Sequence, residues 1–167
     1  LLSEFPELQR VQIRGPRDAT GPECVRLTDL PELREIQLGG GGTTHFVLDR
    51  LPALERLVLG APNQPAVRLG DIRFESRSDA LRFLLIHAPE LEAPDVRPDL
   101  PNLKILDLSG CASIRSLAWT SQMDRLQAIH ARGCEMLEDV RSILPFGELT
   151  HLDLRGCDLL RPRPKPA

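Results

Sequence analysis

A pattern of the form L-x-x-L-x-L, in which other apolar residues can replace the second and third Leu, recurs seven times along this chain of 167 residues. Its closest copies read LPELREIQL at 30–38, LPALERLVL at 51–59 and LPNLKILDL at 100–108. The pattern starts at Leu8, Leu33, Leu54, Leu81, Leu103, Leu126 and Leu149, so that the spacings are 25, 21, 27, 22, 23 and 23 residues. Self-similarity at a nearly fixed period indicates structural units that stack on one another, since a single unit cannot bury its apolar side alone.

Each copy of the pattern predicts one short strand. Apolar residues alternate with others around its middle, which sends the paired apolar side chains to one face of the strand. We expect a curved parallel sheet of about seven strands, three to five residues each, lining the concave face of an α/β solenoid. The expected strand centres are Val11, Ile36, Leu57, Leu84, Leu106, Ile129 and Leu152.

A second register indicates the return path. The pairs Val25-x-Leu27, Phe46-x-Leu48 and Val67-x-Leu69 recur every 21 residues and predict short extended segments on the convex side. Trp119 lies outside the strands and is expected to pack on the same side. The longer repeats contain extra residues, and those at 73–79 predict a helical turn capped by Ser78 or Asp79. The glycines at 39–42 lack the G-x-G-x-x-G spacing of a phosphate loop and predict a turn.

Three of the four cysteines, Cys111, Cys134 and Cys157, occupy the same position after a predicted strand. There a thiol can form a hydrogen bond with the backbone of the neighbouring coil. Zinc sites use cysteines and histidines in close pairs, which this 23-residue spacing does not provide. We therefore predict buried free thiols, no metal and a reducing compartment. Cys24, beside Val25 on the return path, is expected to be packed as well.

Residues 1–160 form the predicted repeat domain, and the Pro- and Arg-rich residues 161–167 are expected to be a tail or linker. The first residue is not Met, and we interpret the chain as a piece of a longer protein. A net charge of −3 with both signs scattered argues against a nucleic-acid partner. No apolar run approaches the roughly 20 residues of a membrane span. We expect a monomer that binds neither nucleic acid nor membrane.

Three rows of side chains are expected to point outward from the concave face. The central row runs through Gln12, Gln37, Val58, Leu85, Asp107, His130 and Asp153. The flanking rows run through Arg10, Glu35, Arg56, Phe83, Ile105, Ala128 and His151, and through Arg14, Gly39, Gly60, His87, Ser109, Arg132 and Arg155. An apolar middle with polar surroundings is typical of an interaction site. The predicted partner-binding residues are Arg56, Val58, Phe83, Leu85, His87, Ile105, Asp107, His130, Arg132, Asp153 and Arg155.

The row Asp107, His130 and Asp153 allows a second interpretation, in which an enzyme uses these groups as acid and base. However, the row contains no Ser or Cys nucleophile, and an open sheet face does not exclude water. We interpret the row as solvated charges that compensate one another, and expect neither catalysis nor a cofactor in this chain. A spacer without any partner is a further alternative.

The repeats resemble the leucine-rich-repeat family over nearly the whole chain. The segments LDLSGC at 106–111 and LDLRGC at 152–157 resemble two of its groups. One is the repeat domain of type III secreted effectors of plant-pathogenic bacteria, some of which carry a ubiquitin-ligase domain, and the other is the repeat region of plant intracellular immune receptors. The Arg- and Pro-rich, Lys-poor composition favours the effectors.

The effector resemblance implies a virulence protein that is secreted by bacteria into a host cell. Its repeats would recognise a host protein through the concave face, and any catalysis would belong to another domain, for example a ubiquitin ligase. The receptor resemblance implies the same kind of protein binding in a plant cell.

Overall fold

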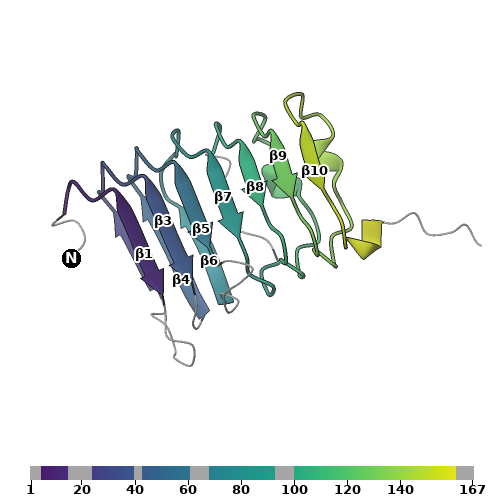
Figure 1. Cartoon of the computed structure of the whole chain (residues 1–167), viewed down its shortest axis with the longest axis horizontal. Coiled ribbons are helices and arrows are strands. Elements are labelled where there is room, and N and C mark those ends of the chain that lie inside the picture. The colour runs from purple at the N-terminus through teal and green to yellow at the C-terminus, as the bar shows by residue number, and fades with distance from the viewer. Residues whose placement is uncertain (1–4, 15–23, 40–42, 61–67, 93–99, 161–167) are drawn as a thin grey trace, which may run out of the picture.

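The structure is a computed structural model that describes residues 5–14, 24–39, 43–60, 68–92 and 100–160. The chain forms a β-solenoid in which each coil adds one parallel strand to a seven-stranded sheet, here called the front sheet (Figure 1). In spatial order its strands are β1 (Arg10–Arg14), β3 (Glu35–Gly39), β5 (Arg56–Leu59), β7 (Phe83–Ile86), β8 (Ile105–Asp107), β9 (Ala128–His130) and β10 (His151–Asp153). Each expected strand centre lies inside one of these strands, so the predicted strand register is confirmed.

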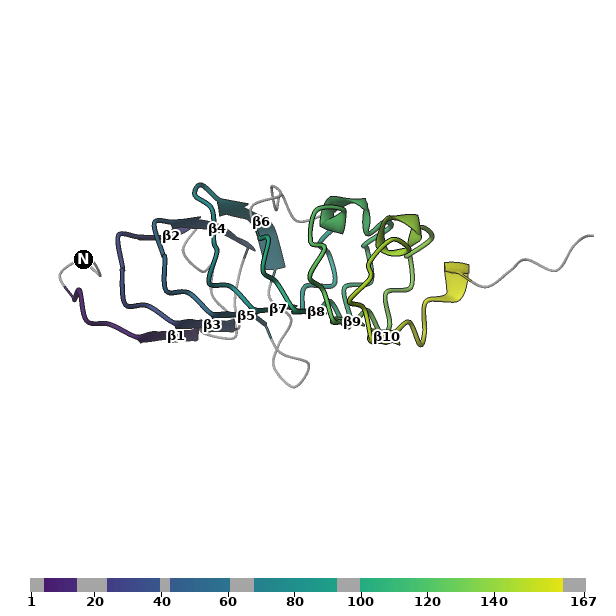
Figure 2. The same cartoon turned by 90° about the horizontal axis from the view of Figure 1, so that it is seen from above.

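The opposite wall of the solenoid changes character along the chain. Its first part is a parallel back sheet of β2 (Cys24–Thr28), β4 (Thr43–Asp49) and β6 (Arg68–Phe74). Its later part contains the 3₁₀-helices η2 (Ala118–Thr120) and η3 (Arg141–Ile143), while η4 (Asp158–Leu160) follows β10. Figure 2 shows both parts facing the front sheet. The described residues contain no α-helix.

Local side-chain bonds explain where the two 3₁₀-helices begin. The Ser116 hydroxyl accepts a hydrogen bond of 3.0 Å from the Ala118 N–H. The Asp139 carboxylate accepts one of 2.9 Å from the Arg141 N–H. Such contacts two residues along the chain favour a turn over an extended strand. Trp119 lies in η2 and packs partly buried against the core, as expected from its place outside the strands.

The third strand of the back sheet differs from its prediction. Phe46 pairs with Ile72 and Leu48 pairs with Phe74, so the expected pair Val67-x-Leu69 is not in register. Val67 lies outside the described residues. The pairing shifts between Thr44 and His45, which accommodates an extra residue in β6 as a β-bulge does. The 21-residue spacing of the sequence pattern was therefore misleading for this strand.

The helical turn predicted at 73–79 is also wrong. Arg73 and Phe74 complete β6, and residues 75–80 form bends with no helix. Ile72 and Phe74 are buried while Arg73 is exposed, an alternation that requires extended backbone. Ser78 is buried in the bend rather than capping a helix. The glycines at 40–42 and the tail at 161–167 lie outside the described residues.

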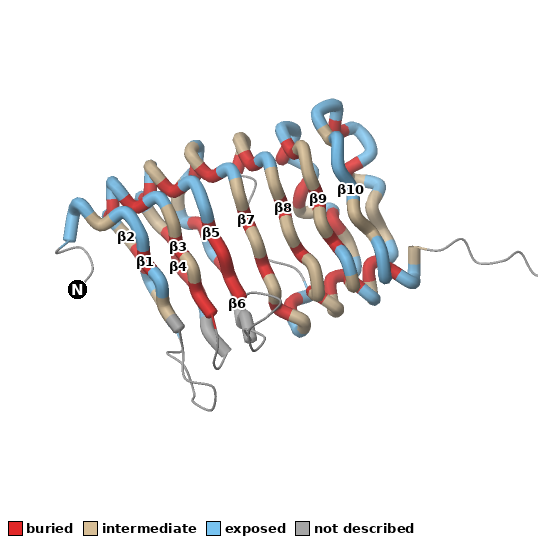
Figure 3. The backbone as a smooth tube through the Cα atoms, viewed as in Figure 1, coloured by how far each residue is buried: buried red, intermediate tan, exposed pale blue. Residues whose placement is uncertain are grey.

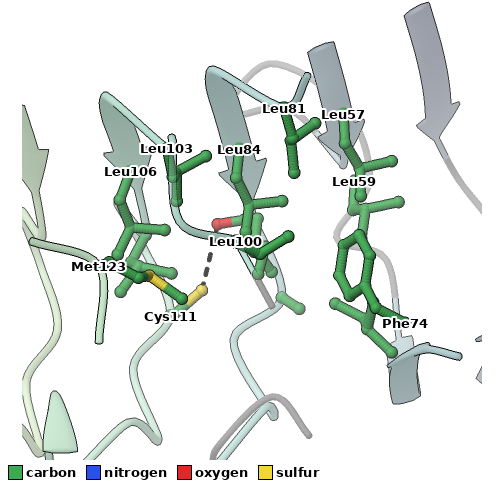
Figure 4. Packing of buried hydrophobic residues seen from close by; sticks show 14 of the residues in the cluster. Leu57, Leu59, Phe74, Leu81, Leu84, Leu100, Leu103, Leu106, Cys111 and Met123 are labelled. Carbon is green, nitrogen blue, oxygen red and sulfur yellow. Dashed lines mark hydrogen bonds between the residues drawn. The ribbon is translucent and has the colours of Figure 1, made fainter. Parts of the chain in front are cut away.

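The core lies between the two walls and consists of the repeated aliphatic positions. Leu33, Leu54, Leu81, Leu103 and Leu126 are fully buried, as are most of their partners on the strands. In Figure 4, Leu57 and Leu59 of the front sheet and Phe74 of the back sheet belong to this cluster. The last coil is less covered: Leu152 is 43% exposed, whereas the equivalent Leu106 and Ile129 are fully buried. Figure 3 shows this difference between β10 and the inner strands.

Three thiols join successive coils. Cys111 donates to the Ile86 carbonyl at 3.2 Å, Cys134 to Leu108 at 3.2 Å and Cys157 to Ala131 at 3.0 Å. Figure 4 shows the first of these bonds. All three thiols are buried and free, as predicted. Cys24 is free but exposed at the start of β2, so its predicted packing is wrong. Cys24 is the first residue of β2, a strand in which only Leu27 is fully buried.

Burial strongly affects the acidity of these thiols. Loss of hydration raises the pKa of Cys111 to about 11 and that of Cys134 to about 12, and it also raises the pKa of Cys157. In the unfolded chain the same thiols would release their protons near pH 9. Unfolding therefore releases protons in alkaline solution, and rising pH favours it.

We expect the free energy of unfolding to fall between about pH 9 and 11, by up to about 1.4 kcal/mol per pH unit for each buried thiol. The chain suits this measurement, because it has no Tyr and only two Lys that would titrate in the same range. Urea unfolding under reducing conditions would provide the values. Cys134→Ser should reduce the slope, and Cys24→Ser should not. A free energy that stays constant over this range would contradict the assignment.

Candidate partner-binding face

The outward side of the front sheet, here called the open face, carries two continuous rows of side chains. Strand pairing places Arg10, Glu35, Arg56, Phe83, Ile105, Ala128 and His151 side by side. It likewise aligns Gln12, Gln37, Val58, Leu85, Asp107, His130 and Asp153. Both rows agree with the sequence prediction. Of the third predicted row, strand pairing places only Arg14 beside Gly39.

The N-terminal part of the open face is a network of ion pairs. Arg10 lies 2.7 Å from the Glu35 carboxylate, and Arg56 lies 3.5 Å from the same group. On the adjoining turns, Arg34 lies 2.9 Å from Glu55. These residues and Gln9 line a shallow hollow of about 510 Å³. Solvent-exposed ion pairs add little to the stability of a fold. These pairs therefore matter mainly for the distribution of charge on this surface.

The middle of the open face is apolar. Phe83, Leu85 and Ile105 are half-buried on β7 and β8, with Phe83 directly beside Ile105 and Leu85 beside Asp107. The Arg56 guanidinium stacks on the Phe83 ring, 3.8 Å from its centre. This cation–π contact ties the charged part of the face to the apolar part.

Two predicted contact residues are less available than expected. Val58 is only 6% exposed. It is a small side chain between the longer Gln37 and Leu85 on the neighbouring strands, and these can cover it. We therefore withdraw Val58 as a contact residue. His87 is half-buried, and its Nδ1 lies 2.7 Å from the Ser109 carbonyl. The His87 ring thus links two coils, a role that the sequence did not reveal.

The predicted row of Asp107, His130 and Asp153 exists, and both of its carboxylates accept hydrogen bonds from residues two positions later. The Asp107 carboxylate accepts a hydrogen bond of 2.9 Å from the Ser109 N–H. Asp153 accepts hydrogen bonds from the Arg155 guanidinium, at 2.8 and 2.6 Å, and from the Arg155 N–H. The Arg155 guanidinium holds the pKa of Asp153 well below its usual range. Each carboxylate thus accepts a hydrogen bond from the residue two positions later in the sequence.

His151 is the residue that sequence reasoning did not include in the site. Its ring lies against that of His130, with centres 5.0 Å apart and planes tilted by 46°. The two residues stand on adjacent strands as diagonal neighbours, two residues apart along the strand direction, because His151 pairs with Ala128 and His130 with Asp153. The sequence analysis placed His130 in the central row and His151 in a flanking row, and it did not predict a contact between them. Arg132, another predicted contact residue, is exposed in the turn after β9.

The open face ends at β10 in a second shallow hollow of about 440 Å³, lined by residues 151–155. No protein-family model and no solved structure matches this chain. Within the described ranges, no group of three or more His, Cys, Asp and Glu residues could hold a metal ion. The same ranges contain no helix long and apolar enough to cross a membrane.

Proposed function

We propose that this chain is a leucine-rich-repeat module that binds another protein through the open face, which would be the concave side of the repeat. The observation that carries the proposal is the apolar group of Phe83, Leu85 and Ile105 in the middle of a charged sheet. Apolar side chains on a water-facing sheet contribute little to the stability of the free molecule. Partly exposed apolar surface with polar surroundings is what protein interfaces use.

The surroundings of this group favour a protein partner. Arg56 stacks on Phe83 and carries a charge, so it could contact an acidic or aromatic group of a partner. On the other side Asp107, His130 and Arg132 supply hydrogen-bonding groups of both kinds. Such a mixture at the edge of an apolar centre provides specificity.

The chain itself is proposed to be a binding module rather than an enzyme. The Asp107, His130 and Asp153 row is the only acid–base arrangement that the sequence suggested. Asp153 is held by Arg155, and its lowered pKa makes it a poor proton acceptor at neutral pH. The free buried thiols suit a reducing intracellular compartment.

The LDLSGC and LDLRGC segments support a more specific proposal, a type III secreted effector of a plant-pathogenic bacterium. The partner would then be a host protein, and catalysis, such as ubiquitin ligation, would reside in another domain. The same segments also resemble the repeat region of plant intracellular immune receptors, and that alternative implies the same binding face.

The open face can be tested by comparing variants of the immobilised chain in plant-cell extract. We expect the Leu85→Glu/Ile105→Glu variant to capture at least about ten-fold less of the partner than the parent chain does. The reason is that two carboxylates would be desolvated at an apolar contact. Folding should be nearly unchanged, since both side chains face outward. Quantitative mass spectrometry would compare the captured proteins, and circular dichroism would verify the fold.

The control carries the same chemical change on other surfaces. Leu144 and Leu159 are 76% and 45% exposed and lie outside the front sheet, so Leu144→Glu/Leu159→Glu should capture the same proteins as the parent chain. If no captured protein depends on Leu85 and Ile105 while both variants fold, the open face is not the binding surface. If only the open-face variant unfolds, the inferred orientation of these two side chains is wrong.

A further inference from the structure

His130 and His151 are in ring contact, and imidazoles at this separation can share one metal ion. The two rings lie on the open face at β9 and β10, with centres 5.0 Å apart. Parallel strands are about 4.8 Å apart, so diagonal neighbours touch only where the side chains lean toward each other. Ala128, the direct neighbour of His151, is small enough to leave space for that lean.

The nitrogen atoms of both rings remain available. Neither imidazole has a hydrogen-bond partner among the residues that the structure describes. His87 differs, because its Nδ1 is occupied by the Ser109 carbonyl. His151 is exposed and His130 half-buried, so an ion can reach the pair from solvent.

The separation of the rings agrees with joint coordination. With metal–nitrogen bonds of about 2.0–2.1 Å, a metal lies about 3.2 Å from the centre of each ring. Two rings that meet at the metal with an angle of about 90–110° then have centres about 4.5–5.2 Å apart. The observed 5.0 Å lies inside this interval.

We propose that His130 and His151 form a two-imidazole site for a divalent transition cation, namely Cu²⁺, Ni²⁺ or Zn²⁺. Imidazole suits these ions, and Cu²⁺ is expected to bind most tightly of the three. The pair supplies two ligands and leaves the other positions to water. Asp107, beside His130, adds a negative charge on one side, whereas Arg132 adds a positive charge and Asp153 is occupied by Arg155. A site of moderate affinity follows from this balance. The inference rests on ring geometry and is independent of the proposed partner.

The test uses the whole chain without a histidine tag, in a Cys24→Ser background because an exposed thiol binds the same ions. Calorimetric titration with Ni²⁺ should show one ion per chain. His130→Ala and His151→Ala should each weaken binding by about ten-fold or more, because a single imidazole remains. His45→Ala is the matched control, since His45 is an exposed histidine on β4 of the back sheet, and it should bind like the parent.

Electron paramagnetic resonance of the Cu²⁺ complex provides an independent result. Coupling to two imidazole nitrogens is expected in the parent and to one in either single variant. Equal Ni²⁺ affinity in the parent and in His151→Ala would overturn the site. So would coupling to a single nitrogen in the parent, or a loss of binding in His45→Ala as large as in the other two. Circular dichroism of each variant separates loss of a ligand from loss of folding.

Discussion

Replacing Leu106 by alanine is expected to lower the free energy of unfolding by about 2–5 kcal/mol. Leu106 is fully buried at the centre of β8, between the equivalent Leu84 and Ile129 on the neighbouring strands. Its removal leaves a cavity that the flanking coils cannot fill, because their own side chains are fixed by the same sheet register. Urea unfolding followed by circular dichroism would measure the loss.

Leu152 provides the matched comparison. It occupies the same repeat position on β10 but is 43% exposed. Leu152→Ala should therefore cost no more than about 1 kcal/mol, because little apolar surface returns to water and no enclosed cavity forms. Equal losses for Leu106→Ala and Leu152→Ala would mean that the last coil is as well covered as the inner ones.

Gly60→Ala is expected to destabilise the fold by about 2–5 kcal/mol, the sum of a backbone penalty and a steric one. Gly60 follows β5 with a φ of +78°, where a side chain is strained. A Cβ there would lie 2.5 Å from the backbone oxygen of His87 in the next coil. Backbone cannot move aside as a flexible side chain can, so adjacent coils would have to separate.

Gly133 isolates the steric part of this loss. It has nearly the same φ, +72°, but a Cβ there would have no neighbour within 4 Å. Gly133→Ala should therefore cost only about 1–2 kcal/mol, the backbone penalty alone. Thermal or urea unfolding of both variants would give the difference. If Gly133→Ala proved as destabilising as Gly60→Ala, contact with His87 would not be the cause.

The front sheet could be predicted from the sequence because its signal is redundant. Each strand carries several apolar residues at fixed spacing, and each neighbour repeats them, so that one poor copy is corrected by the others. The copy at 78–86 keeps only its second half, yet Leu84 still marks the centre of β7. The same strand register also predicted which side chains lie next to one another in the rows of the open face.

The back wall could be predicted less well because its signal is local. The pair Val67-x-Leu69 has the correct spacing, but Ile72 and Phe74 fill the core positions instead. A bulge or a short insertion shifts the register of a strand without changing its composition. The bonds that start η2 and η3 likewise depend on single residues, Ser116 and Asp139.

Parts of the site also depend on contacts that a linear pattern does not contain. Val58 is buried, whereas Leu85 at the equivalent position of the next strand is only half-buried, and the pattern does not distinguish the two. The position of His87 over Gly110 depends on how two turns approach each other. The contact between His130 and His151 joins two separate repeats, and Ala128 on the strand of His130 is the direct neighbour of His151.

The thiol bonds between coils have a consequence for how such a protein can change in length. Each of Cys111, Cys134 and Cys157 donates to a carbonyl of the coil before it, so each of these three coils has its own attachment to its neighbour. A duplicated coil would arrive with both its donor and its acceptor, and the coils on either side would keep their original partners. Duplication or loss of one repeat in the gene could thus lengthen or shorten the open face in whole steps.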